Sequence, residues 1–210
     1  MAPRRATSGA AAAKHLRAAD PVLARMLDEQ GTPAARTPTG DPYGALMRVI
    51  CGQQLSVAAA RAIYGRLVER FGGRPPSPEE LLAEDPDELR PAVGLSRAKT
   101  VTLWSLAQHV VDGDLALDRL GELGDDELVA ELTAVKGIGE WTAQIYLMGE
   151  LGRRDVLAVG DLGIRRAVER AYGLDDMPSR DELIALAAPW RPYRTMACSL
   201  LWHSLDNAPV

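Results

Sequence analysis

The sequence is poor in several residue types that carry chemistry elsewhere. Two of its 210 residues are cysteine, Cys51 and Cys198, which is too few for a disulfide scaffold and fits a reducing cytoplasm. The three histidines are scattered along the chain without the spacing of metal ligands. Aromatic residues make up only 5% of the chain. Each tryptophan is therefore more informative than usual.

Long hydrophobic runs are also missing. No apolar stretch approaches the ~18 residues that a membrane-spanning helix needs. The first residues are small and basic and lack the apolar core of a secretory signal, so we expect residues 1–19 to form a flexible tail before one domain over 20–210. The sequence predicts a cytoplasmic protein without membrane contact.

The chain lacks an excess of positive charge. It has 24 Lys and Arg against 29 Asp and Glu, a net charge of −5, whereas nucleic-acid-binding domains are usually basic. The acids, however, cluster over 79–88 and 122–131. We expect a locally basic face from the arginines that flank the motifs described below, although the same residues could be solvated helix faces: Arg153, Arg154, Arg165, Arg166, Arg170, Arg191 and Arg194.

No segment alternates as a strand should, and most of the chain has helical periodicity. Asp20, Ser56 and Ser96 have the position and chemistry of N-caps, and Ser77 and Ser179 each begin a capping box with a glutamate three residues later. The sequence predicts an all-α fold, with helices over 21–30, 43–51, 57–71, 81–85, 87–93, 97–112, from 125 into the hairpin described next, and over 162–172, 180 onward and about 193–205.

One stretch, 132–148, predicts a helix end, a tight turn and a new helix. It reads Leu132-Thr-Ala-Val-Lys-Gly137-Ile-Gly139-Glu-Trp141 and continues with a helical pattern. Glycines can take positive φ and leave no side chain in the way. A turn of this kind presents backbone N–H groups and a helix N-terminus to an anion, such as a DNA phosphate.

A second stretch, Ala158-Val-Gly-Asp161-Leu-Gly-Ile-Arg, places one acid at the start of another helix. From local sequence alone, Asp161 reads as a helix N-cap. A carboxylate can also stabilise the positive charge that develops on a sugar when an N-glycosidic bond breaks, and can orient a water.

Together the two stretches resemble the helix-hairpin-helix DNA glycosylases, and within that superfamily the 3-methyladenine DNA glycosylase II (AlkA) group. The resemblance extends from Asp41 to Asp206. It implies two helical lobes with an active-site cleft between them, and Asp161 as the catalytic aspartate, which acts as a carboxylate. The mixed α/β lobe that often precedes the fold in this group is expected to be absent here.

The resemblance also implies roles for two tryptophans. Trp141 stands where many strand-cleaving members have a nucleophilic lysine, so the enzyme is expected to be monofunctional. Its indole would stack on a cationic alkylated base in the pocket. Trp202 matches a second aromatic residue of that pocket. Either could instead be a core tryptophan.

DNA contacts follow from the same resemblance. Gln54 best matches the wedge that fills the gap left by a flipped base, with Leu55 and then Gln53 as further candidates; the alternative is a helix break whose amides bond to backbone. The N–H groups of Gly137 and Gly139 would hold a phosphate. Lys136, where the family often has proline, could touch one too.

The resemblance implies a monovalent cation, Na⁺ or K⁺, bound by backbone carbonyls of Thr133, Val135 and Ile138. Two cysteines cannot hold the four-cysteine iron–sulfur cluster of other branches, and no organic cofactor is expected. The loop before Asp161 lacks the usual proline, which leaves its rigidity without an obvious source.

The expected function is therefore base excision by a monomer at the nucleoid. It would hydrolyse the N-glycosidic bond of alkylated purines in double-stranded DNA, 3-methyladenine first and 7-methylguanine second, and leave an abasic site. One alternative is a glycosylase of this fold for deaminated or oxidised bases. Another is a non-catalytic hairpin protein that binds DNA.

Overall fold

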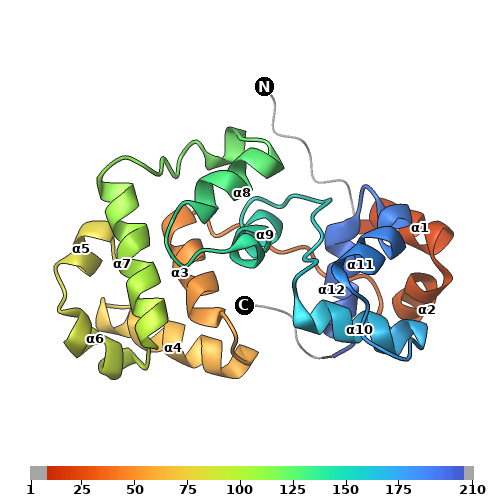
Figure 1. Ribbon diagram of the computed structural model, residues 1–210, viewed down its shortest axis with the longest axis horizontal. Helices are drawn as coiled ribbons and strands as arrows, with labels where there is room; N and C mark the ends of the chain where they lie inside the picture. The colour runs from red at the N-terminus through yellow and green to blue at the C-terminus, as the bar shows by residue number, and fades with distance from the viewer. Residues whose placement is uncertain (1–8, 206–210) are drawn as a thin grey trace. The chain divides into compact units, whose positions relative to one another are not determined.

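The computed structural model describes residues 9–205, and every regular element in this range is a helix (Figure 1). This confirms the predicted all-α fold. The chain forms two compact units. The continuous unit comprises residues 38–146, and the discontinuous unit comprises residues 9–37 and 147–205.

The continuous unit contains most of the predicted helices at the expected places. They are α3 (Pro42–Gly52), α4 (Val57–Arg70), α5 (Pro78–Leu82), α6 (Pro86–Val93), α7 (Arg97–Val111), the 3₁₀ turn η1 (Leu120–Glu122) and α8 (Asp125–Thr133). Helix α9 (Glu140–Gly149) begins in this unit, and the unit boundary falls inside it. The helix predicted over 81–85 starts earlier, because the Ser77 capping box fixes its first turn.

Helix α7 is the centre of the continuous unit. It packs against α3, α5 and α6, while α4 packs against α3 and α6. Leu46, Ile50, Leu67, Leu103 and Leu106 are fully buried. These residues recur at helical spacing, so their burial is the main stabilising contribution to the unit.

The discontinuous unit joins the two ends of the described chain. It contains α1 (Gly9–Ala19), α2 (Pro21–Gln30), α10 (Leu162–Tyr172), α11 (Arg180–Leu186), the 3₁₀ turn η2 (Ala188–Trp190) and α12 (Arg194–His203). Helix α12 packs against α10, α2 and α1, as Figure 1 shows.

The prediction of a flexible tail over residues 1–19 is wrong for residues 9–19, which form α1. Residues 1–8 lie outside the described range. A run of alanines looks featureless in sequence, but alanine has the highest helix propensity of any residue. Ala12, Ala13 and Leu16 form a buried face that packs on the rest of the unit.

Asp20 joins the N-terminal helices to the rest of the discontinuous unit. Its Oδ1 caps α2 by accepting from the N–H groups of Val22 and Leu23, at 2.8 and 3.2 Å. Its Oδ2 accepts from the Tyr172 hydroxyl at 2.5 Å and from Trp190 Nε1 at 2.9 Å. Asp20 is only 7% exposed. One buried acid thus links residues from both ends of the chain.

No helix among residues 9–205 combines the length and the apolar character that crossing a membrane requires.

Asp20→Ala should lower the free energy of unfolding by about 3 kcal/mol, because it removes a helix cap and leaves the buried Trp190 N–H and the half-buried Tyr172 hydroxyl without their acceptor. Urea denaturation followed by circular dichroism measures this. Asp28→Ala is the control, since the Asp28–Arg17 ion pair is exposed and should contribute less than about 1 kcal/mol. Equal midpoints for the two variants would contradict the role assigned to Asp20.

Candidate functional site

The hairpin between α8 and α9 is a short turn at the surface of the continuous unit. Ile138 N donates to Val135 O at 3.0 Å, which closes a turn over residues 135–138. Gly137 has φ of 89°, in the region that favours glycine. Lys136, Gly137 and Gly139 are exposed. Among residues 9–205, the N–H groups of the two glycines have no acceptor, so they can donate to an anion.

Gly137 is required by close packing as well as by its φ. A Cβ at this position would lie 1.9 Å from Thr102 Oγ1 and 2.9 Å from Thr102 Cβ, on helix α7. A Cβ at Gly139 would meet nothing within 4 Å. Helix α7 therefore supports the hairpin directly beneath Gly137.

The three wedge candidates are in different environments. Gln54 is exposed, and Leu55 is 41% exposed, at the turn between α3 and α4. The side chain of Gln53 is instead held by two hydrogen bonds: its Nε2 donates to Gly137 O at 3.1 Å and to Thr142 Oγ1 at 2.9 Å. While these bonds are formed, Gln53 cannot reach into DNA. Gln54 and Leu55 remain the candidates.

The carbonyls predicted to bind a monovalent cation lie in the same hairpin. Val135 O already accepts the Ile138 N–H, and a carbonyl oxygen keeps a second lone pair for a ligand. Neutral oxygen donors suit Na⁺ or K⁺ better than a transition metal.

Trp141, the residue predicted to stack on the base, is half-buried in the first turn of α9.

Asp161 begins helix α10 in the discontinuous unit. Its Oδ1 accepts from Ile164 N at 2.8 Å, so the N-cap interpretation of this residue is confirmed. The same oxygen accepts from Trp202 Nε1 at 3.0 Å. The residue is only 8% exposed. Two donors on one oxygen fix the carboxylate group in a single orientation.

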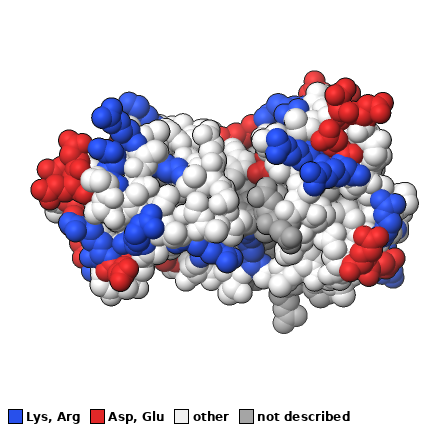
Figure 2. Space-filling view, turned by 90° about the horizontal axis from the view of Figure 1, so that it is seen from below, with Lys and Arg blue, Asp and Glu red and all other residues white. Residues whose placement is uncertain are grey.

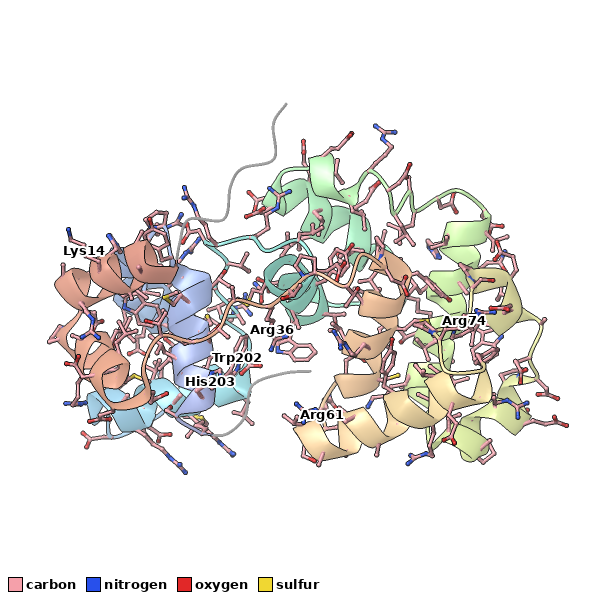
Figure 3. The ribbon with its side chains drawn as sticks, turned by 180° about the vertical axis from the view of Figure 1, so that it is seen from behind. Lys14, Arg36, Arg61, Arg74, Trp202 and His203 are labelled. Carbon is pink, nitrogen blue, oxygen red and sulfur yellow. The ribbon has the colours of Figure 1, made fainter. Side chains whose placement is uncertain are left out.

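Trp202 lies on α12 (Figure 3) and is 2% exposed. The sequence predicted that it lines a base pocket or packs in the core. The structure adds a contact that neither interpretation included, the hydrogen bond to Asp161. Whatever else it touches, Trp202 holds the candidate catalytic acid.

The loop before Asp161 has no proline, and helix α12 holds it instead. Thr195 Oγ1 donates to Arg153 O at 2.7 Å and accepts from Val156 N at 3.1 Å. Arg194 Nε donates to the Asp155 carboxylate at 2.7 Å. The next residues, 156–159, are buried. Hydrogen bonds thus replace the rigidity that proline would supply.

Five of the seven arginines expected to form a basic face divide into two groups. Arg191 and Arg194 pair with Asp155, and Arg165 donates to Pro178 O at 2.8 Å, so these three support the fold. Arg166 and Arg170 are exposed on α10 and line a surface pocket. Figure 2 shows Lys and Arg side chains gathered in several groups, with Asp and Glu side chains beside some of them. The negative net charge therefore does not exclude local basic patches.

Both cysteines are buried free thiols, and burial raises the pKa of each to about 12. They are accordingly unreactive at neutral pH. Among residues 9–205, no three His, Cys, Asp or Glu side chains are grouped so that they could bind a metal ion.

Several residues that shape the site carry no sequence signature. Lys99 and Thr102 read as ordinary helix positions, and Arg194 and Thr195 as the start of a helix. Lys99 is 8% exposed and its Nζ donates to Cys51 O at 2.8 Å, at the end of α3. Burial lowers the pKa of this ammonium. The one available signal is that polar residues, a lysine and two threonines, occupy buried positions of α7, where apolar residues are usual.

Comparison with protein families gives a match over most of the chain. The profile described as HhH-GPD superfamily base excision DNA repair protein matches residues 47–192. DNA-3-methyladenine glycosylase 1 of Schizosaccharomyces pombe is 34% identical over 166 residues, which cover 78% of this chain and 72% of the relative. A Bacillus subtilis relative is 31% identical over 170 residues, and the match spans 59% of its length.

Solved structures match at similar identity. The S. pombe 3-methyladenine DNA glycosylase in complex with abasic DNA has a TM-score of 0.88 at 31% identity, covering 95% of this chain and 98% of that one. A DNA-3-methyladenine glycosidase from Bacillus halodurans has a TM-score of 0.76 at 36% identity, covering 92% and 88%.

Gly137→Ala should destabilise the protein by about 3 kcal/mol or more, because the new Cβ combines a left-handed φ with a clash against Thr102. Gly139→Ala, two residues away and in open space, should cost less than about 1 kcal/mol. Urea denaturation of the two variants makes the comparison. Similar midpoints would mean that α7 does not support the hairpin through Gly137.

Proposed function

Because the chain belongs to the HhH-GPD superfamily of base excision DNA repair proteins, we propose that it is a monofunctional DNA glycosylase for alkylated purines. Its substrates are 3-methyladenine first and 7-methylguanine second, in duplex DNA. It acts as a monomer at the nucleoid, and its product is an abasic site with the strand unbroken.

The observation that carries this proposal is the buried carboxylate of Asp161, held by Trp202 and by the first turn of α10. In its ionised form, a fixed carboxylate near the anomeric carbon stabilises the oxocarbenium-like transition state. It can also orient the water that attacks the sugar. Preorganisation matters here, since a carboxylate already in place needs no rearrangement as the charge develops.

Alkylated purines suit a site with this composition. A methyl group on N3 or N7 makes the base cationic and weakens the glycosidic bond, so the leaving group supplies part of the discrimination. Trp141 can stack its indole on such a cation. No lysine stands at that position to attack the sugar, which supports base release without strand cleavage.

On the DNA side, the free N–H groups of Gly137 and Gly139 would bind a phosphate, with Lys136 beside them. A monovalent cation at the carbonyls of Thr133, Val135 and Ile138 would add positive charge to this contact. Such a cation has no redox role, and its site is made of neutral oxygen atoms only.

The test is release of free base from methylated duplex DNA by the wild type and by Asp161→Asn. Asparagine keeps the shape and can accept both hydrogen bonds at Oδ1, so the fold should be retained. We expect the rate of 3-methyladenine release to fall on the order of 100-fold or more. Gel electrophoresis before and after alkali distinguishes intact abasic strands from cleaved ones.

Two results would overturn the proposal. Equal base release by Asp161→Asn would remove Asp161 from the chemistry. Absence of release by the wild type from methylated DNA would mean another lesion, for which duplexes with deaminated or oxidised bases are the next substrates, or a protein that only binds DNA.

Trp202→Phe should lower the single-turnover rate of base release roughly tenfold, because it removes the hydrogen bond that holds the Asp161 carboxylate. Trp190→Phe is a matched control: Trp190 is an equally buried tryptophan of the same unit, and its indole also donates to an aspartate. The control should lower stability and leave the rate unchanged. Equal rates for both variants would refute a positioning role for Trp202.

A further inference from the structure

The turn between α3 and α4 has an unusual backbone. Leu55 N donates to Gly52 O at 3.2 Å, and Gln53, with φ −52° and ψ 127°, is the second residue of this four-residue turn. Gln54 follows with φ of 56°, the one positive φ outside glycine among residues 9–205. These values match a type II turn, whose third residue is usually glycine.

A side chain at this position costs free energy. A residue with a Cβ in the left-handed region is strained by roughly 1–2 kcal/mol, and such strain persists only where the surrounding structure enforces it. Gln54 therefore implies that the turn is held from outside. Strained residues of this kind gather at functional sites.

The side chain of Gln53 provides one of these restraints. Its amide crosses to the hairpin, where Nε2 donates to Gly137 O and to Thr142 Oγ1, at 3.1 and 2.9 Å. Gly137 is one of the two glycines whose N–H groups are available to a phosphate, and Thr142 lies in the first turn of α9. One side chain thus bonds to the hairpin on both sides of its second glycine.

Helix α7 contacts both the end of α3, where the turn begins, and the hairpin. Lys99 Nζ donates to Cys51 O at the end of α3, and Thr102, one turn further along, packs against Gly137. Ser56 caps α4 directly after the turn, by accepting from Ala59 N at 3.3 Å. The turn and the hairpin are therefore fixed to the same helix and, through Gln53, to each other.

We propose that Gln53 is a positioning residue that fixes the wedge turn, Gln54 and Leu55, relative to the phosphate-binding hairpin. A strand gripped at the hairpin then meets the wedge at a set distance, so phosphate binding and insertion into the base stack occur together. This deepens the proposed function and rests on it. It also replaces the prediction that Gln53 is itself a wedge candidate.

The experiment is a double-mutant cycle on DNA binding. The wild type, Gln53→Met, the variant Gln54→Ala/Leu55→Ala and the combined variant are titrated with two duplexes of one sequence, one intact and one with a tetrahydrofuran abasic analogue. Methionine has the length of glutamine but no donor, and alanine keeps the Cβ at each wedge position. The measured quantity is the ratio of the two dissociation constants.

Gln53→Met should reduce the preference for the abasic duplex roughly tenfold in the wild-type background, as expected for losing two hydrogen bonds. In the Gln54→Ala/Leu55→Ala background, Gln53→Met should change the preference by less than about twofold. Gln53 is proposed to act through the wedge side chains, which are already absent there. Gln108→Met is the control: this exposed glutamine of the same unit bonds only to Asp112 within the described residues, and its loss should change nothing.

Equal effects of Gln53→Met in both backgrounds would overturn the proposal, since Gln53 would then act on the fold and not through the wedge. An unchanged preference in the wild-type background would overturn it too. The binding ratio does not depend on which base is excised. A failure to release 3-methyladenine would therefore count against the proposed function and leave this result to be judged separately.

Discussion

Loop peptide groups that no helix or sheet pairs need other hydrogen-bond partners, and this requirement governs both loops that carry the candidate site. Neither loop belongs to a regular element that would supply partners. Helix α12 provides them for the loop before Asp161, because Arg194 donates to the Asp155 carbonyl and Thr195 bonds to Arg153 O and Val156 N. Helix α7, with Gln53, does the same for the hairpin and the end of α3. Each unit thus uses one helix, α7 or α12, as the support for one loop.

The two interpretations of Asp161, helix cap and catalytic acid, are compatible. The cap uses Oδ1, which also receives the Trp202 indole N–H. Capping fixes the position of the residue, and the indole fixes the rotation of the carboxylate. A catalytic carboxylate gains from both, because its charge must already be oriented when the sugar becomes positive. The N-cap hydrogen bond of Asp161 therefore also preorganises its carboxylate for catalysis.

Sequence reasoning succeeded where the determinants are local. Caps at Asp20, Ser56 and Ser96 depend on residues two or three positions away, so they and the helices they begin could be predicted. The all-α fold and the place of the hairpin followed from the same kind of pattern. Residues 9–19 were missed because an alanine run has no polar face to mark its period.

Contacts between distant residues could not be predicted. Gln53 meets Gly137 and Thr142 across more than 80 positions, and Trp202 meets Asp161 across 41. Nothing near either residue in the sequence indicates the partner. A glutamine next to a wedge position and a tryptophan in a C-terminal helix have many possible uses. Their common role, holding another residue in place, becomes visible only when the chain is folded.

The discontinuous unit has a consequence for synthesis of the protein. Helices α1 and α2 are synthesised before the continuous unit, whereas their partners α10 and α12 are synthesised after it. The continuous unit can fold in the interval, since all its helices lie between residues 38 and 146 except for the end of α9. The apolar faces of α1 and α2 must meanwhile stay soluble without a core. The unit that holds the aspartate proposed for catalysis is consequently completed after the continuous unit, so a chain translated only as far as α9 would have the hairpin and yet lack the means to excise a base.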